Sequence, residues 1–136
     1  MKEAVLRDLL RQLSTAFETR DLAALTDQFS ATDVVTYAGS ESGEKATSPR
    51  EVRRLLSGLL SRPVAYAFEF GDLTFDERQG TVWLLAEGEG TQIGDDGTTE
   101  MFPYRLTGVL VYERAHWRWL MLVGSEPTAT SADLEG

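Results

Sequence analysis

The sequence predicts one α+β domain in which three helices come first and a strongly curved antiparallel sheet follows. Two observations support this prediction. Apolar residues recur mostly at steps of three and four before Pro63 and at steps of two after it, the periods of helices and of strands. The second half also holds four long segments separated by short turns. At 136 residues, the chain has the length of a single domain.

The N-terminal part predicts two consecutive helices and a short strand. Residues 3–19 carry one apolar stripe at helical spacing, made of Val5, Leu6, Leu9, Leu10, Leu13, Ala16 and Phe17. Asp21 is placed to cap a second helix that reaches Phe29. The β-branched residues 34–37 then predict a short strand, and the Gly-, Ser- and Glu-rich residues 39–47 predict a loop.

A third helix has a well-defined start and end in the sequence. Ser48 can cap it, Pro49 suits its first position, and Glu51 can complete a capping box. Proline cannot continue a helix, so Pro63 ends it. The apolar positions of this helix are Val52, Leu55, Leu56, Leu59 and Leu60.

The second half of the chain predicts an antiparallel meander. Its strands are expected at residues 64–75, 81–93, 100–114 and 117–126, joined by turns at 76–80, 94–97 and 115–116. Several strands are apolar on both faces, and the helices can cover only one, so we expect the other face to meet a second subunit in a homodimer. We predict a single domain over residues 1–127 and a flexible tail over 128–136.

Composition excludes several classes of partner. The net charge is −9 and no Lys/Arg cluster offsets it, which argues against nucleic-acid binding. No apolar run is long enough to span a membrane, and the N-terminus lacks the pattern of a signal peptide. The chain has no cysteine, which excludes disulfides and thiolate chemistry. The expected location is the cytoplasm.

The order of these elements resembles the nuclear transport factor 2-like superfamily, and in particular its SnoaL-like members. The local sequence is similar too, at Phe17–Leu22, Tyr104–Val109, Trp117–Trp119 and Gly124–Pro127. The resemblance implies a cone-shaped fold, with three N-terminal helices packed on a strongly curved mixed or antiparallel sheet, and a homodimer. Members of the superfamily include isomerases, dehydratases, polyketide cyclases, binding proteins and oligomerisation domains, so the fold alone does not assign a function.

The resemblance argues against two kinds of chemistry. The steroid isomerases of the superfamily use a tyrosine and a carboxylate base, and the aligned positions here hold Leu13 and Thr36. Dehydratases and cyclases commonly use a histidine inside the cone. The single histidine here, His116, falls in a tight turn at the sheet edge, where we expect it to be exposed and inert. We therefore predict no metal site and no cofactor.

Carboxylates and hydroxyls remain as candidate functional groups. Glu87 and Glu126 are the candidate catalytic residues, because a buried glutamate with a raised pKa can transfer protons near neutral pH. Arg105 is expected to form a buried pair with a glutamate, either as a clamp for a carboxylate or carbonyl of the ligand or as a structural ion pair. The tripeptide Gly-Ser-Glu occurs at 39–41 and at 124–126, either as a polar lip of the pocket or as turn chemistry. The candidate ligand-binding residues are Tyr37, Ser40, Glu69, Trp83, Glu87, Arg105, Ser125 and Glu126.

Three hypotheses for function follow. The first is a homodimer that binds a small, mostly apolar metabolite in its cone. The second is an acid–base enzyme of the cyclase, isomerase or hydrolase type, which requires a pocket carboxylate near Tyr37 or Arg105. The third is a structural or partner-binding module, which a cone filled by its own side chains would favour.

Overall fold

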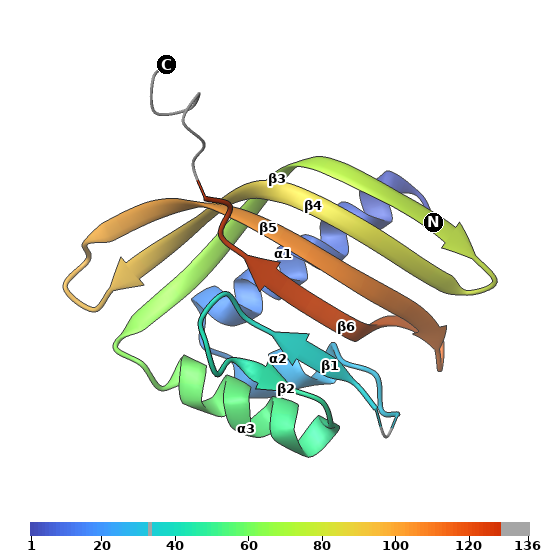
Figure 1. The fold of residues 1–136 in the computed structure, drawn as a ribbon, viewed down its shortest axis with the longest axis horizontal. Helices are drawn as coiled ribbons and strands as arrows, with labels where there is room; N and C mark the ends of the chain where they lie inside the picture. Colours follow the sequence, from blue (N-terminus) through green and yellow to red (C-terminus); the bar gives the residue numbers. More distant parts are fainter. Residues whose placement is uncertain (33, 129–136) are drawn as a thin grey trace.

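Within residues 1–32 and 34–128, which the computed structural model describes, the chain forms three helices and six strands (Figure 1). All three predicted helices and all five predicted strands are present, and the α+β class is confirmed. In chain order the elements are α1 (Glu3–Glu18), α2 (Leu22–Asp27), β1 (Thr36–Ala38), β2 (Lys45–Ala46), α3 (Pro49–Leu60), β3 (Val64–Arg78), β4 (Thr81–Gly94), β5 (Thr99–Glu113) and β6 (His116–Ser125).

The helices begin where the predicted caps lie. The Asp21 carboxylate accepts a hydrogen bond from the Ala24 N–H at 3.0 Å and caps α2. Ser48 Oγ accepts the Glu51 N–H at 3.2 Å at the start of α3, and Glu51 reaches back to the Thr47 N–H at 3.1 Å. The bonds to Asp21 and Ser48 satisfy N–H groups that a helix leaves without partners at its start, and the bond to Glu51 holds the residue that precedes the Ser48 cap.

The sheet is mixed, with the strand order β2-β1-β6-β5-β4-β3. Strands β3 to β6 form the predicted antiparallel meander, and β1 pairs in parallel with β6. Several details of the prediction were wrong. Helix α2 ends at Asp27 and not at Phe29, and β3 runs to Arg78, through part of the predicted turn 76–80. The predicted loop 39–47 contains β2, which pairs with β1 as a hairpin, and the predicted strand 34–37 begins only at Thr36. Strands of two or three residues are formed by pairing with neighbours and carry little signal of their own.

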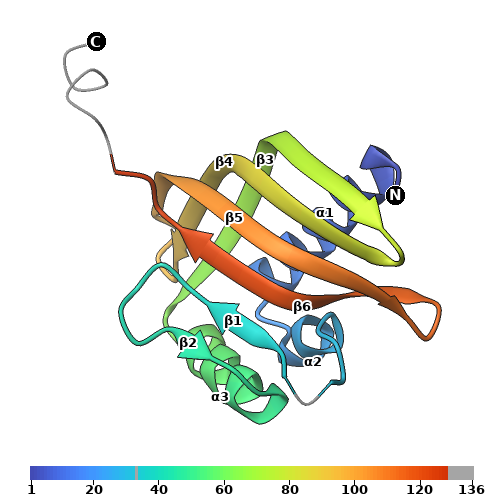
Figure 2. The same cartoon turned by 45° about the vertical axis from the view of Figure 1, so that its right-hand side comes forward.

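The two faces of the sheet differ sharply in burial. The side chains of the inner face, which the helices cover, are buried and include Val82, Leu84, Ala86, Leu106, Leu110 and Leu122. Figure 2 shows α1 crossing behind β3 to β5, with α2 and α3 below β6 and β1. The outer face keeps exposed apolar side chains, among them Trp83 and Met121. The curved sheet and the helices thus enclose one core on one side of the sheet.

Among the residues that the structure describes, no helix is both long and apolar enough to cross a membrane. The predicted tail at 128–136 lies outside the described residues apart from Thr128.

Candidate functional site

A pocket of about 160 Å³, which we call the aromatic pocket, lies at the end of the sheet where the β1–β2 loop, the end of α3 and the β4–β5 hairpin meet. Aromatic side chains form most of its apolar wall: Phe17, Tyr37, Tyr66, Phe68, Phe102 and Tyr104. The rings pack on one another, with 4.7 Å between the ring centres of Phe68 and Tyr104. Polar groups line the same pocket beside the rings, among them Ser40, Glu41, Glu44, Arg62 and Glu126.

The β1–β2 loop sets the position of Glu44. The Gly39 N–H donates to the Glu44 carbonyl at 2.8 Å, and the Glu44 N–H donates to the Glu41 carbonyl at 3.1 Å. A Cβ atom on Gly39 would lie only 1.9 Å from Glu44 Oε2, so a residue with a side chain at position 39 would displace the carboxyl group. The glycine therefore provides the space in which Glu44 lies.

Glu44 and Glu41 form a pair of carboxyl groups with different proton affinities. Burial, a hydrogen bond to Glu41 and the charges of Glu41 and Glu126 raise the pKa of Glu44 from 4.5 to about 7. The pKa of Glu41 is lowered by its hydrogen bonds to Glu44 and Arg62. The Arg62 guanidinium lies 3.2 Å from the Glu41 carboxylate. Glu44 can therefore hold or release a proton near neutral pH.

Two tyrosine hydroxyl groups in the pocket have no hydrogen-bond partner among the described residues. Tyr37 is 6% exposed and Tyr104 is 9% exposed. Burial raises the pKa of both hydroxyls well above the usual value. Neither hydroxyl oxygen is fully enclosed by protein, and both residues line the pocket, so these two groups are available to a bound molecule.

The two Gly-Ser-Glu tripeptides meet at the rim of this pocket. Ser40 Oγ donates to Glu126 Oε2 at 2.9 Å, which joins the first tripeptide to the second. The ring of Tyr104 lies on Gly124, where a Cβ atom would be 1.7 Å from the hydroxyl oxygen. The structure thus combines both interpretations of the repeat, because the glycines provide close packing while Ser40, Glu41 and Glu126 line the pocket.

Four of the candidate residues lie away from the pocket. Trp83, Glu87 and Arg105 have odd numbers on β4 and β5, whose even-numbered side chains face the core, and Ser125 has an odd number on the last part of β6, where Leu122 and Gly124 are the buried residues. Arg105 Nε lies 3.5 Å from Glu87 Oε1, and the two side chains are 44% and 47% exposed. The expectation of a buried Arg105–glutamate pair was therefore wrong, because both residues point to the outer face of the sheet.

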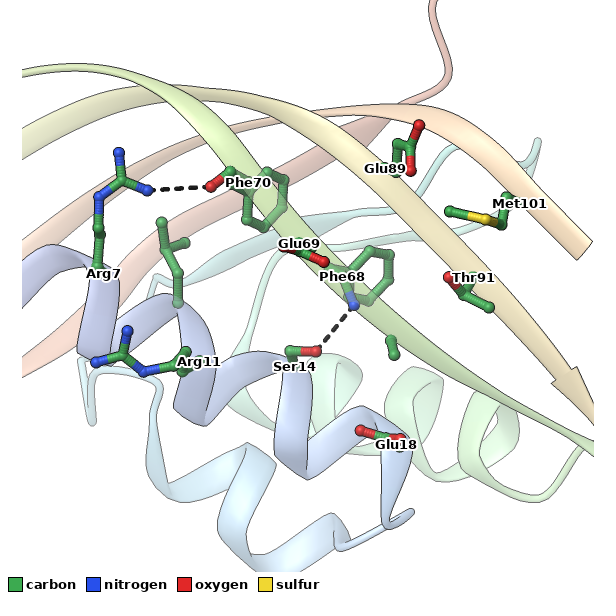
Figure 3. Close-up of a pocket in the computed structure, with 12 residues that line it drawn as sticks. Arg7, Arg11, Ser14, Glu18, Phe68, Glu69, Phe70, Glu89, Thr91 and Met101 are labelled. Carbon is green, nitrogen blue, oxygen red and sulfur yellow. Dashed lines mark hydrogen bonds between the residues drawn. The ribbon is translucent and has the colours of Figure 1, made fainter. Parts of the chain in front are cut away.

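Glu69 lies in a different hollow, the α1–β3 groove (Figure 3). This groove is larger, at about 500 Å³, but its polar groups hold α1 against the free edge of β3. Ser14 Oγ accepts the Phe68 N–H at 2.8 Å, and Arg7 donates to the carbonyls of Phe70 and Gly71 at 3.1 and 2.9 Å. Covering a free sheet edge is a structural role, so the aromatic pocket is the better candidate site.

His116 is exposed at the start of β6, as predicted. In the described part of the chain, no group of three or more His, Asp or Glu side chains is arranged to hold a metal ion.

Sequence reasoning missed Glu44 and Arg62. Glu44 belongs to a segment whose Gly, Ser and Glu content is typical of an exposed loop, and Arg62 follows a helix end. The spacing of Gly39 and Glu44 was the only available signal, and it becomes informative only when the hairpin is known.

Comparison with known proteins agrees with this architecture. A family model described as a SnoaL-like domain matches residues 6–129. Among curated proteins, no sequence matches significantly. A proposed dehydratase of the nuclear transport factor 2-like family from Streptomyces avermitilis superposes with a TM-score of 0.79 at 15% identity, over 93% of this chain and 98% of that one.

Two further solved structures have the same fold. A nuclear transport factor 2-like superfamily protein from Salmonella enterica gives a TM-score of 0.78 at 11% identity, over 95% of this chain and 93% of that one. A proposed aromatic ring hydroxylase from Novosphingobium aromaticivorans gives 0.77 at 16% identity, over 93% and 89%. At these identities the likeness shows the fold alone. The family match covers most of the chain, and the protein therefore belongs to the SnoaL-like family, with a nuclear transport factor 2-like fold.

Proposed function

We propose that this protein binds a small, mostly apolar molecule with a single ring in the aromatic pocket, and that it does so in the cytoplasm. The observation that carries the proposal is a pair of largely buried tyrosines, Tyr37 and Tyr104, whose hydroxyls line the pocket and make no hydrogen bond among the described residues. The size of the pocket supports a single ring. An apolar protein cavity of about 150 Å³ is known to take up benzene, and this pocket has about 160 Å³.

A second candidate function is acid–base catalysis on the bound molecule. It is favoured by Glu44, whose pKa of about 7 suits proton transfer at neutral pH. Tyr37 and Tyr104 would donate hydrogen bonds to a carbonyl or hydroxyl oxygen of the ligand. Glu126 lies beside Glu44 as an acceptor, whereas Glu87 is on the opposite side of the sheet. The similar fold of a proposed dehydratase is compatible with this role.

We expect Tyr37→Phe to weaken binding without destabilising the protein. The hydroxyl makes no protein hydrogen bond among the described residues, so its removal should leave the melting temperature unchanged or slightly higher. Losing its bond to a ligand oxygen or nitrogen should weaken affinity by about fivefold to tenfold. Thermal-shift and calorimetric titrations with single-ring compounds that carry one polar group measure both effects.

Tyr112→Phe is the matched control, because Tyr112 is 55% exposed near the β5–β6 hairpin and does not line the pocket. It should bind like the wild type. Equal affinities for wild type and Tyr37→Phe would show that the hydroxyl does not serve the ligand. A lack of any stabilisation across such compounds would contradict the binding proposal.

The outer face of the sheet supports the proposal that two copies of the chain form a homodimer. The same apolar face would be the contact surface if the protein is instead a structural or partner-binding module. Trp83, Val109 and Met121 are direct cross-strand neighbours on β4, β5 and β6 and form an apolar row. Trp83 is 43% exposed and Met121 is 39% exposed. A two-fold axis through this face would place the same row on itself and bury it in both copies.

Met121→Glu should disrupt such a dimer, because it would bury a charge without a partner at the centre of the contact. Sizing chromatography with light scattering at micromolar concentration should give a dimer for the wild type and a monomer for the variant. Val5→Glu makes the same kind of change at an exposed position of α1 and should remain dimeric. A monomeric wild type would contradict the proposed dimer.

A further inference from the structure

The pocket carries more negative than positive charge. Four glutamates line it, Glu41, Glu44, Glu100 and Glu126, against the single cation Arg62. Arg62 is already paired with Glu41 at 3.2 Å, and Glu126 accepts a hydrogen bond from Ser40 at 2.9 Å. Within the described residues, no ion pair is formed by Glu44, whose side chain is half-buried. An anionic ligand would be repelled from this site, whereas a positive charge beside Glu44 would be stabilised.

The aromatic wall favours the same kind of ligand. The negative face of an aromatic ring attracts a cation within about 6 Å of its centre. Tyr104 lies at the centre of a cluster of rings, with its ring centre 4.7 Å from that of Phe68 and 5.9 Å from that of Phe102. Tyr37 and Tyr66 also line the pocket beside the glutamates. A neutral ligand could pack against the rings of this site, but it would not pair with the carboxylates.

We propose that the ligand is an organic cation, a single-ring or similarly small amine whose ammonium group lies between Glu44 and the tyrosines of the pocket. This inference rests on the proposed binding function and specifies its ligand class. The ring of the ligand would occupy the apolar wall, and the ammonium N–H groups would donate to Glu44 and to the hydroxyl oxygens of Tyr37 and Tyr104.

Binding of such a cation is coupled to the protonation of Glu44. The charged and titratable groups that face Glu44 are Glu41 in the same loop, Arg62 after α3, Glu126 after β6, Tyr37 on β1 and Tyr104 on β5. Burial and the two neighbouring carboxylates keep Glu44 partly protonated at neutral pH. A bound ammonium favours the ionised carboxylate, so binding should release a proton, and affinity should rise as the pH increases from 6 to 8.

The test compares three ring compounds of nearly equal size by isothermal titration calorimetry: benzylamine, benzyl alcohol and benzoate. At pH 8, benzylamine should bind about tenfold more tightly than benzyl alcohol, and benzoate should bind most weakly. At pH 6 the preference for the amine should fall to about threefold or less, because Glu44 is then mostly protonated. At pH 7, titrations in two buffers with different ionisation enthalpies should show proton release on binding of the amine.

Glu44→Gln keeps the shape of the side chain and removes its charge, so it should abolish most of the preference for the amine at pH 8. Glu89→Gln is the matched control, since Glu89 is exposed on β4 and outside this pocket. It should keep the wild-type preference. The inference is overturned if benzyl alcohol binds as tightly as benzylamine, or if the preference survives in Glu44→Gln, while the proposed binding function still stands. If none of the three compounds binds, the binding function itself is contradicted.

Discussion

Replacing Trp119 with alanine should lower the free energy of unfolding by about 3–5 kcal/mol, the usual cost of removing a large buried aromatic side chain. Trp119 is 1% exposed and is one of the largest fully buried side chains in the described part of the chain. Folded domains are stable by only about 5–15 kcal/mol. The variant should therefore lose a large share of the stability of the fold.

The size of this effect follows from the position of Trp119 between separate parts of the fold. Its ring lies against Gly108 on β5, where a Cβ atom would be 2.7 Å from the ring. Its backbone N–H donates to the Gln28 carbonyl, and its carbonyl accepts the Ser30 N–H, both at 2.8 Å. Alanine preserves these backbone hydrogen bonds. The loss of unfolding free energy therefore measures the contribution of the side chain and the cost of the cavity that its removal leaves.

Urea unfolding followed by circular dichroism measures the effect, and Trp83→Ala provides a matched control. Trp83 is 43% exposed on the outer face, so its replacement should cost less than about 1 kcal/mol in the isolated subunit. Similar losses in the two variants would contradict the assignment of the core. A loss in Trp83→Ala that depends on protein concentration would instead report the proposed dimer contact.

The sequence predicted the long elements well because their signals are local. The cap residues Asp21 and Ser48 make the hydrogen bonds expected of them, and the change of apolar period at Pro63 marks the passage from α3 to β3. The short strands could not be placed in the same way. β2 has two residues and is held by its pairing with β1, so its existence depends on a contact between segments and not on its own composition.

The site was predicted less well, because the sequence did not show which alternate side chains of each strand face the core. Three of the candidate residues, Tyr37, Ser40 and Glu126, line the pocket. Glu87 and Arg105 instead face outward, because a strand that is apolar on both faces does not reveal which alternate side chains point to the core. A change of one position moves a residue to the other face of the sheet, and the sequence has no means to decide between them.

The carboxyl group with the most unusual pKa could not have been found from the sequence. Glu44 is separated from Glu126 by 82 positions, and its properties come from burial and from carboxylates that reach it from two segments of the chain. A loop residue gains such an environment only when the fold is complete. Functional groups commonly reside in loops for this reason, on a frame that secondary structure provides.

Glu44→Gln should stabilise the protein at pH 8 and have little effect at pH 4. The pKa of Glu44 is about 7 in the folded chain, against 4.5 for an ordinary glutamate. Below pH 4.5 the group is mostly protonated in both the folded and the unfolded states. As the pH rises toward 7, the unfolded chain loses this proton first, so the wild type loses stability across this range. Glutamine has no proton to lose, and the variant should therefore escape this loss.

A gain of about 1–2 kcal/mol at pH 8 is expected. A pKa unit corresponds to about 1.4 kcal/mol, and the value is reduced here because water screens the exposed part of the side chain. Unfolding in urea at pH 4, 6 and 8 measures the effect, with Glu89→Gln as the control that should follow the wild type to within about 0.5 kcal/mol. A loss of stability in Glu44→Gln at pH 8 would mean that the ionised carboxylate has a favourable partner in the fold. The expected gain would instead mean that the fold retains a carboxyl group at the cost of stability, as proteins do at sites that bind or react.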